Sequence, residues 1–183
     1  MPEHRLEPLT PMGHTTPQTD TIGPVTITEN TSMAMASLAT RRGRAADVAN
    51  AAKSLNITLP APGHASQTAL WLAPDQWMIA APFATHEDIV VHLKPFFGDA
   101  ASITEQTGAW VRFDLTGANL PAMFELLCNL DTRAMQPGHA TRTVIEHLGC
   151  YVTCTSAGFT ILGPGSSAKS LHHALITAAR SAF

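Results

Sequence analysis

Three cysteines are the first side chains to judge chemically, because thiols form disulfides, ligate metals and act as nucleophiles. Cys150 and Cys154 would lie on one face of a strand with Val152 between them. At about 3.3 Å per residue their sulfurs would be about 13 Å apart, too far for a disulfide or a shared zinc ion. With Cys128 the count is odd, so we expect three reduced, packed thiols and a cytoplasmic location.

Nine histidines are many for a chain of 183 residues, but their spacing does not suit a metal site. His172 and His173 are adjacent, and neighbours on a helix point about 100° apart. His86 and His92 are expected on different faces of one helix. We therefore predict no metal ligands on this chain.

Neither glycine-rich turn has the form that binds nucleotide phosphates. Residues 162–167, LGPGSS, precede a predicted helix, but no Lys-Ser/Thr follows and Pro164 removes one N–H donor. Residues 114–117, DLTG, do not form a GxGxxG turn. A turn and a helix cap is the expected role of residues 162–167, and no cofactor-binding residue is predicted.

Acidic side chains could supply a general acid and a general base if two of them met. No pattern forces such a pair, and no Ser/His/Asp spacing is decisive, so no catalytic residue is predicted. Each candidate acid is expected to be solvated or to cap a turn: Asp75, Glu105, Asp114, Glu125, Asp131 and Glu146.

Two successive series of strand and helix patterns must position these residues. The first predicts a strand at 32–39, a helix at 44–55 and a hairpin of 67–73 and 76–81. A second helix follows, capped by Thr85 and with Ile89, Leu93 and Phe96 on one face, and a strand at 101–105 ends the series. The second series predicts a strand at 110–115, a helix with Leu120, Met123, Phe124 and Leu127 on one face, and strands at 140–147, 150–155 and 159–162. Along 110–115 the apolar residues Val111, Phe113 and Leu115 face one way and Trp110, Arg112 and Asp114 the other. A last helix, capped by Ser166 or Ser167, has an apolar stripe of Leu171, Ala174, Leu175 and Ala178.

The first series follows the order β-α-β-β-α-β. The second follows the similar order β-α-β-β-(β)-α and lacks a closing strand, which residues 25–28 could supply. The order predicts an α+β fold of duplicated ferredoxin-like (split βαβ) units, at about 32–107 and 108–183. These units form a single domain at 22–183. Residues 1–21 are proline-rich, lack the apolar core of a secretory signal, and are predicted to be an extended N-terminal tail.

Composition excludes several classes of function. Hydrophobic residues make up 45% of the chain without a run long enough to span a bilayer, so no membrane association is expected. The net charge is −3 with 11 Lys and Arg, which argues against nucleic-acid binding. Charged residues are 14%, against about 25% in an average soluble domain. So few charges favour a chain that covers part of its surface with a partner.

A series of short motifs resembles the gamma subunit of heterotetrameric sarcosine oxidase. The stretch WLAPDQWM at 71–78 is similar to that family's W-L-G-P-D-E-W-L hairpin, and LTGA at 115–118 resembles its L-S-G-P turn. Residues 129–143 resemble its LDL…R-T stretch, and SSAKSLHHAL at 166–175 resembles its last helix. The resemblance covers about residues 30–180.

The resemblance implies a non-catalytic structural subunit that assembles with alpha, beta and delta subunits. Such a complex demethylates sarcosine oxidatively to glycine, a step of one-carbon metabolism, and yields hydrogen peroxide with formaldehyde or methylene-tetrahydrofolate. FAD, FMN, NAD, tetrahydrofolate and zinc would belong to the partner subunits. The implied fold is similar to the folate-binding domain of aminomethyltransferases.

The alternative is a stand-alone folate-binding protein of this aminomethyltransferase-like fold. A pterin site would need a fixed carboxylate beside an aromatic wall. Asp114 or Glu125, with Trp110 or Phe113, are the residues that could supply one.

Overall fold

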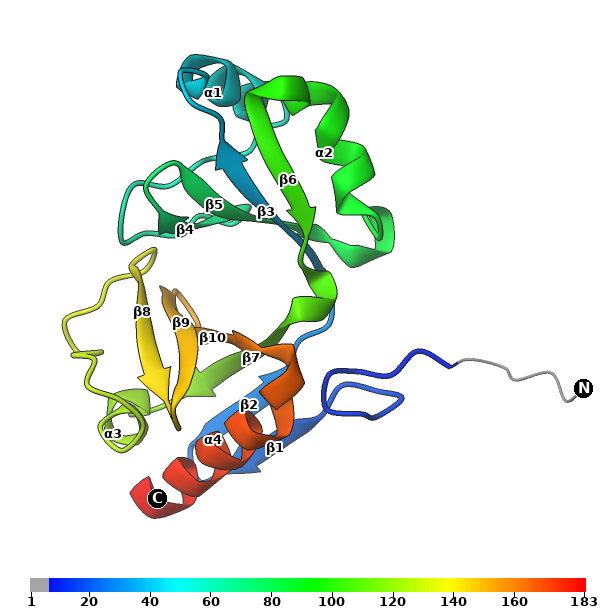
Figure 1. Cartoon of the computed structure of the whole chain (residues 1–183). Coiled ribbons are helices and arrows are strands. Elements are labelled where there is room, and N and C mark those ends of the chain that lie inside the picture. The colour runs from blue at the N-terminus through cyan, green and yellow to red at the C-terminus, as the bar shows by residue number, and fades with distance from the viewer. Residues whose placement is uncertain (1–6) are drawn as a thin grey trace, which may run out of the picture.

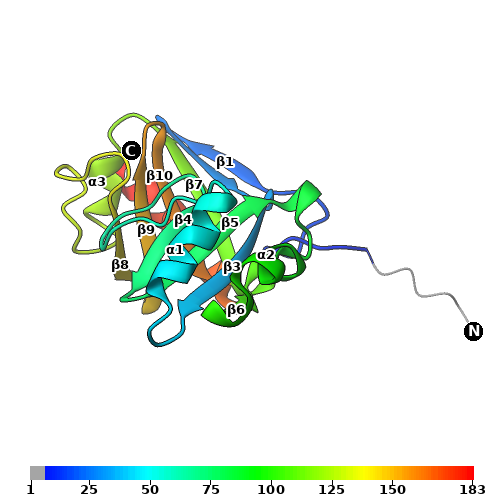
Figure 2. The same cartoon turned by 90° about the horizontal axis from the view of Figure 1, so that it is seen from above.

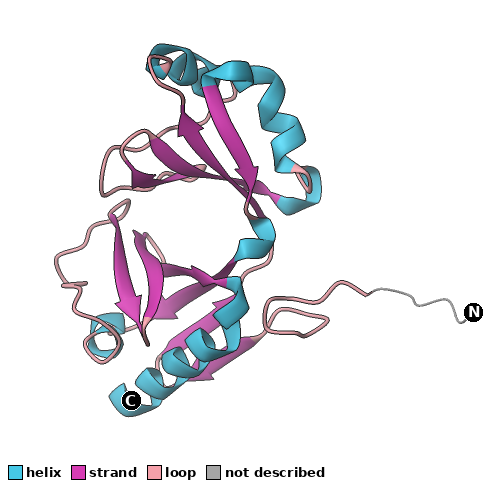
Figure 3. Cartoon of the chain, viewed as in Figure 1, coloured by secondary structure: helices cyan, strands magenta, loops and turns pink. Residues whose placement is uncertain are grey.

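Two antiparallel sheets face each other, and helices cover their outer sides (Figures 1 and 3). The computed structural model describes residues 7–183. The α+β class predicted from the sequence is confirmed. None of the helices in the described residues is both long and apolar enough to cross a membrane.

The smaller sheet has four strands in the order β4 (Ala69–Ala73), β5 (Gln76–Pro82), β3 (Met33–Thr40), β6 (Ala101–Glu105). Helix α1 (Ala45–Ser54) connects β3 to β4, and β5 lies between these two strands. Helix α2 (Ile89–Phe97) connects β5 to β6, and β3 lies between them. Each connected pair is split by a third strand, as in a ferredoxin-like unit. Viewed from above, α1 and α2 both lie over this sheet (Figure 2).

The larger sheet has six strands in the order β1 (Thr19–Ile22), β2 (Val25–Glu29), β7 (Trp110–Gly117), β10 (Gly158–Pro164), β9 (Leu148–Thr155), β8 (Ala140–Ile145). Helix α3 (Leu120–Phe124) follows β7, and helix α4 (Ala168–Ala182) follows β10. Short 3-10 turns lie at Phe83–Thr85, Gly98–Ala100, Thr107–Ala109 and Gly165–Ser167.

The closing strand of the second unit comes from the N-terminal end of the chain. β2 pairs antiparallel with β7, from Val25 opposite Gly117 to Glu29 opposite Phe113. Helix α4 ends beside the turn into β2, where a Cβ atom at Gly23 would lie 2.8 Å from the Cβ of Phe183. β2 therefore lies where a strand following α4 would lie, as the sequence predicted.

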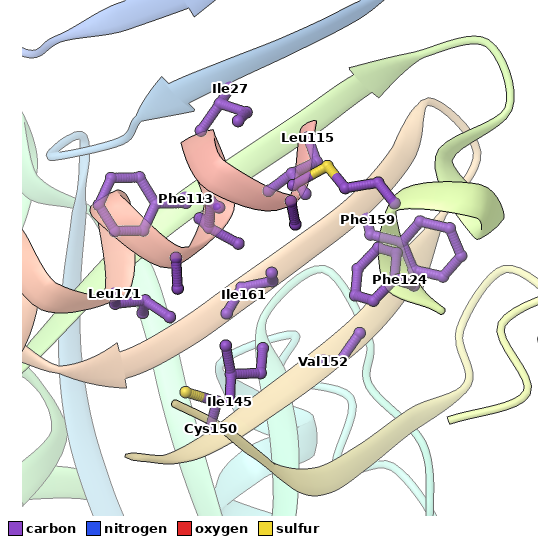
Figure 4. Packing of buried hydrophobic residues seen from close by; sticks show 14 of the residues in the cluster. Ile27, Phe113, Leu115, Phe124, Ile145, Cys150, Val152, Phe159, Ile161 and Leu171 are labelled. Carbon is purple, nitrogen blue, oxygen red and sulfur yellow. The ribbon is translucent and has the colours of Figure 1, made fainter. Parts of the chain in front are cut away.

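The core of the larger unit lies between its sheet and the helices α3 and α4 (Figure 4). Alternation along β7 points Val111, Phe113 and Leu115 into this core, and all three are fully buried. The predicted apolar stripe of the last helix packs against them, with Leu171 and Leu175 fully buried. The alternation along β7 and the helical spacing along α4 thus predicted the buried face of each element correctly.

The helix after the hairpin differs from the prediction in its cap and in one core residue. It begins at Ile89, and the Asp88 carboxylate accepts a hydrogen bond from the backbone N–H of Val91 at 3.2 Å, so Asp88 replaces Thr85 as the cap. Phe97 is buried, four residues after Leu93 and eight after Ile89 on the same face of the helix. Phe96, predicted to be buried, is 53% exposed.

The segment before the sheets is more ordered than the predicted tail over 1–21, of which residues 1–6 lie outside the described part. Thr19–Ile22 forms β1, which pairs with β2, so strand structure begins inside the predicted tail. Met12 is buried in the larger core. The buried Glu29 carboxylate accepts backbone N–H bonds from Met12 at 3.0 Å and Gln18 at 3.2 Å. These bonds fix residues 12–18 against the larger sheet.

Candidate functional site

The inner faces of the two sheets meet only in part. Alternation along β7 that buries its odd-numbered residues turns Trp110, Arg112 and Asp114 toward the smaller sheet. A small apolar cluster joins the two inner faces: Met35, Leu70, Met78, Ala140 and Leu162. One further link is a backbone bridge, in which the N–H of Ala65 donates to the carbonyl of Gly138 at 2.8 Å.

A cavity of about 590 Å³ remains between the sheets, and we call it the inter-sheet cavity. This volume is within the range of about 300–1,000 Å³ typical of small-molecule sites. On the side of the smaller sheet its lining is mostly apolar, with Met33, Met35, Leu70 and Met78, and the loop before β4 adds Ser66 and Gln67. On the side of the larger sheet the lining carries Arg112 and the hydroxyl groups of Thr153, Thr155, Ser156 and Thr160.

Asp114 fixes the position of the Arg112 side chain beside this cavity. Its Oδ1 accepts from Arg112 Nε at 2.8 Å and from Thr160 Oγ1 at 2.8 Å, and its Oδ2 accepts from Asn30 Nδ2 at 2.6 Å. The ion pair is about three-quarters buried on both sides, so solvent screens it less than a surface pair. Three donors from three strands or strand ends thus hold one carboxylate.

Of the residues predicted for a pterin site, the structure brings only Asp114 and Trp110 to the inner face. Trp110 packs 5.7 Å from Tyr151, centroid to centroid. Phe113 points the opposite way, into the core beneath α4. Glu125 lies beyond α3 and pairs with Arg133 at 2.7 Å, with both side chains about 60% exposed.

The other acids remain separate, as expected. Asp75, in the hairpin turn, is exposed, and so are Glu105, Asp131 and Glu146. Asp114 is the exception, because it is neither solvated nor a turn cap but the acceptor of an internal network. Within residues 7–183 no group of three or more His, Cys, Asp or Glu side chains could hold a metal ion.

Two pairs of histidines come together in ways that the spacing did not predict. The rings of His86 and His92 are 4.8 Å apart, although we expected them on different helix faces. His86 precedes α2 instead of lying on it, so helical geometry does not set its direction. His64 and His139 meet 5.1 Å apart where the two sheets are bridged.

The cysteines are free, and two of them lie on one buried strand face as predicted. Cys150 and Cys154 belong to the larger core, and Cys128 is half-buried. Burial, with a smaller contribution from neighbouring Cys128, raises the pKa of the Cys150 thiol to about 11. A thiol with so high a pKa stays protonated near neutral pH and is a poor nucleophile.

The turn at residues 162–167 leads from β10 into α4 and packs against the connection between the two units of the fold. A Cβ atom at Gly165 would lie 3.0 Å from the carbonyl oxygen of Gly108, in the short 3-10 turn that joins the units. Ser167 precedes α4 but makes no side-chain cap hydrogen bond. The turn therefore packs closely against the connection between the units.

Arg112 is the site residue that sequence reasoning missed. Alternation placed it on the face away from the core, but only pairing of β7 with β2 and β10 shows what surrounds it. Its side chain is held by Asp114, and the other two donors to that carboxylate, Asn30 and Thr160, are 84 and 46 positions from Asp114 in the chain, where no motif marks them.

Comparison with known proteins adds one close structural likeness. No family model matches the sequence, and neither does any curated protein. The chain is similar to one from the heterotetrameric sarcosine oxidase of Corynebacterium sp. U-96, solved in complex with pyrrole 2-carboxylate. The TM-score is 0.72 and the identity 22%, and the match covers 86% of this chain and 84% of that chain.

A weaker likeness is to the regulatory subunit of aspartate kinase from Thermus thermophilus. Its TM-score is 0.48 and its identity 14%, with 86% of this chain and 99% of that chain covered. The likeness to the sarcosine oxidase chain, with its TM-score of 0.72, confirms at the level of the fold the similarity that the motifs indicated.

Proposed function

We propose that this chain is a non-catalytic structural subunit, of the gamma type, in a heterotetrameric sarcosine oxidase. The observation that carries the proposal is the fold likeness to a chain of such a complex, which extends over nearly the whole of both chains. The series of motifs between residues 71 and 175 supports it independently, because their order along the chain matches that of the gamma subunit.

In this proposal the complex demethylates sarcosine oxidatively to glycine, releasing hydrogen peroxide and either formaldehyde or methylene-tetrahydrofolate. Alpha, beta and delta subunits are the partners and hold FAD, FMN, NAD, tetrahydrofolate and zinc. The complex is cytoplasmic. The relation of this fold to the folate-binding domain of aminomethyltransferases is part of the same proposal.

The chemistry of the inner face is consistent with a structural role. Amine oxidation transfers a hydride, and no amino-acid side chain accepts one, so the reaction needs a flavin or another redox cofactor. The inter-sheet cavity is lined by an arginine, hydroxyl groups and apolar side chains, which can bind a molecule but cannot oxidise it. A partner subunit would therefore supply the redox centre.

Exposed apolar side chains give the proposal a surface for partner contact. Val91 and Phe96 belong to α2 and are 62% and 53% exposed. Val144, on the edge strand β8, is 59% exposed. Large apolar side chains that are exposed in the isolated chain favour a surface that a partner covers.

Reconstitution tests the proposal directly. We expect the purified chain to be colourless and inactive on sarcosine with added FAD and FMN, and to co-elute with the alpha and beta subunits in gel filtration. Replacing Val91 and Phe96 together by serine should weaken co-elution, whereas Leu126→Ser, at an exposed site beyond α3, serves as the matched control. Flavin absorbance retained by the lone chain, or elution separate from both subunits, would overturn the assignment.

The stand-alone folate-binding alternative has less support from the geometry. A pterin edge needs a carboxylate with unused acceptor capacity, and Asp114 already accepts from Arg112, Thr160 and Asn30. Tight binding of tetrahydrofolate by the isolated chain, followed through quenching of tryptophan fluorescence, would favour this alternative over the subunit.

A further inference from the structure

The inter-sheet cavity contains a single formal charge among its described lining residues, that of Arg112. The guanidinium of Arg112 donates through Nε to Asp114. Within residues 7–183, neither terminal nitrogen of Arg112 has a hydrogen-bond partner. The cavity therefore combines an apolar wall with a cation that still has donors to offer.

The network around Asp114 fixes this cation in position before any ligand arrives. Asp114 lies two residues from Arg112 on the same strand face, and Asn30 and Thr160 donate to the two oxygens of its carboxylate. A guanidinium held along one edge presents its remaining N–H groups in a fixed plane. Such preorganisation lowers the entropy lost when a planar anion binds.

We infer that the inter-sheet cavity binds a small organic carboxylate through Arg112. The carboxylate would accept hydrogen bonds from the terminal nitrogens of the guanidinium, which match its geometry. The apolar part of the ligand would lie against the wall formed by Met35, Leu70 and Met78. The hydroxyl group of Thr153 would donate to the carboxylate and complete the polar end.

Other ligand classes fit this lining less well. Inorganic phosphate has no apolar part to cover the methionine wall, and one cation that already pairs with Asp114 compensates its charge poorly. A metal ion would need carboxylate, imidazole or thiolate ligands, and Cys154 alone among the described lining residues could supply one. An uncharged apolar molecule would leave the guanidinium donors without acceptors.

The inference does not rest on membership of an oxidase complex, because all the residues that build the site belong to this chain. Its test uses the full chain labelled with ¹³C at the methionine methyl groups. Met33, Met35 and Met78 line the cavity, whereas Met12 and Met123 lie in the core beneath α4 and serve as internal references. Benzoate is the probe, and benzamide is its uncharged match.

We expect benzoate to shift the three cavity methyl signals in a saturable way and to leave the two reference signals in place. Benzamide and inorganic phosphate should bind at least tenfold more weakly. Arg112→Gln should weaken benzoate at least tenfold, and Arg133→Gln, which removes an exposed arginine beyond α3, should not change its affinity.

Ala80→Leu provides a second variant that leaves the Arg112 network intact. Ala80 lines the cavity, so a larger side chain should fill it and abolish binding of benzoate while the reference methyl signals report a folded core. Three outcomes would each overturn the inference: no saturable shift with benzoate, equal binding of benzoate and benzamide, or shifts confined to Met12 and Met123.

Discussion

Glu29 is a fully buried acidic residue whose carboxylate holds the segment that precedes the larger sheet. Both of its oxygens are used, one by the N–H of Met12 and the other by the N–H of Gln18. In Glu29→Gln, one of these N–H groups would face an amide donor and lose its acceptor inside the protein. We expect the free energy of unfolding to fall by about 2 kcal/mol and residues 7–18 to be cleaved faster in limited proteolysis.

Glu125→Gln is the matched control, because it makes the same chemical change at an exposed ion pair with Arg133. Exposed pairs contribute about 0–1 kcal/mol, so this variant should unfold at nearly the wild-type denaturant concentration. Equal stability and equal cleavage of the two variants would mean that Glu29 does not anchor the segment.

Gly117 shows how the contact between two strands restricts the residue types at one position. It ends β7 with φ at +121°, and a Cβ atom there would overlap the carbonyl oxygen of Pro24 at the start of β2. Backbone cannot move aside as a flexible side chain can, so Gly117→Ala must shift β2 away from β7. We expect a loss of about 3 kcal/mol in the free energy of unfolding, measured by urea denaturation.

Gly43→Ala separates this effect from backbone conformation alone. Gly43 also has a positive φ, +75°, but a Cβ atom there would have nothing within 4 Å. Gly43→Ala should lower the free energy of unfolding by about 1–2 kcal/mol, the cost of placing an alanine in the left-handed backbone conformation. If Gly117→Ala costs no more than Gly43→Ala, close packing of β2 on β7 is not the reason for glycine at 117.

The larger unit is closed by a strand from the opposite end of the chain. Because Phe183 lies beside Gly23, a short linker from residue 183 to residue 24 would place β2 directly after α4. A permuted chain that begins at residue 31 and ends with residues 24–30 should fold with one cooperative thermal transition. Its melting temperature should be lower than that of the full chain, because β1, Met12 and the N–H donors to Glu29 are removed. Its second unit would then have the order β-α-β-β-β-α-β without interruption.

Deletion of residues 1–30 without reattachment is the control for this permutation. It removes Val25 and Ile27 from the larger core and leaves β7 as an exposed edge. We expect this chain to aggregate or to lose its cooperative transition, because an unpaired edge above an incomplete core is not stable. A stable deletion variant would show that β2 is dispensable to the fold.

Local patterns determined the elements and their buried faces. Side chains alternate along a strand and recur every three to four residues along a helix, so β7 and α4 reveal their core-facing residues without any knowledge of their neighbours. The same patterns predicted the β-α-β-β-α-β order of the first unit and the similar order of the second. They also predicted the role of residues 25–28 as the closing strand, which the pairing of β2 with β7 confirms.

Only the tertiary structure decided which polar side chains meet. Alternation along residues 110–115 predicts an outward-facing Asp114. Its donors Asn30 and Thr160 come from distant parts of the chain, brought beside it by strand pairing. The burial of Glu29 and the contact between His86 and His92 likewise depend on neighbours that the sequence does not mark. Periodicity is a property of the local backbone, whereas a cavity and its charge arise from the register between strands that are far apart in the sequence.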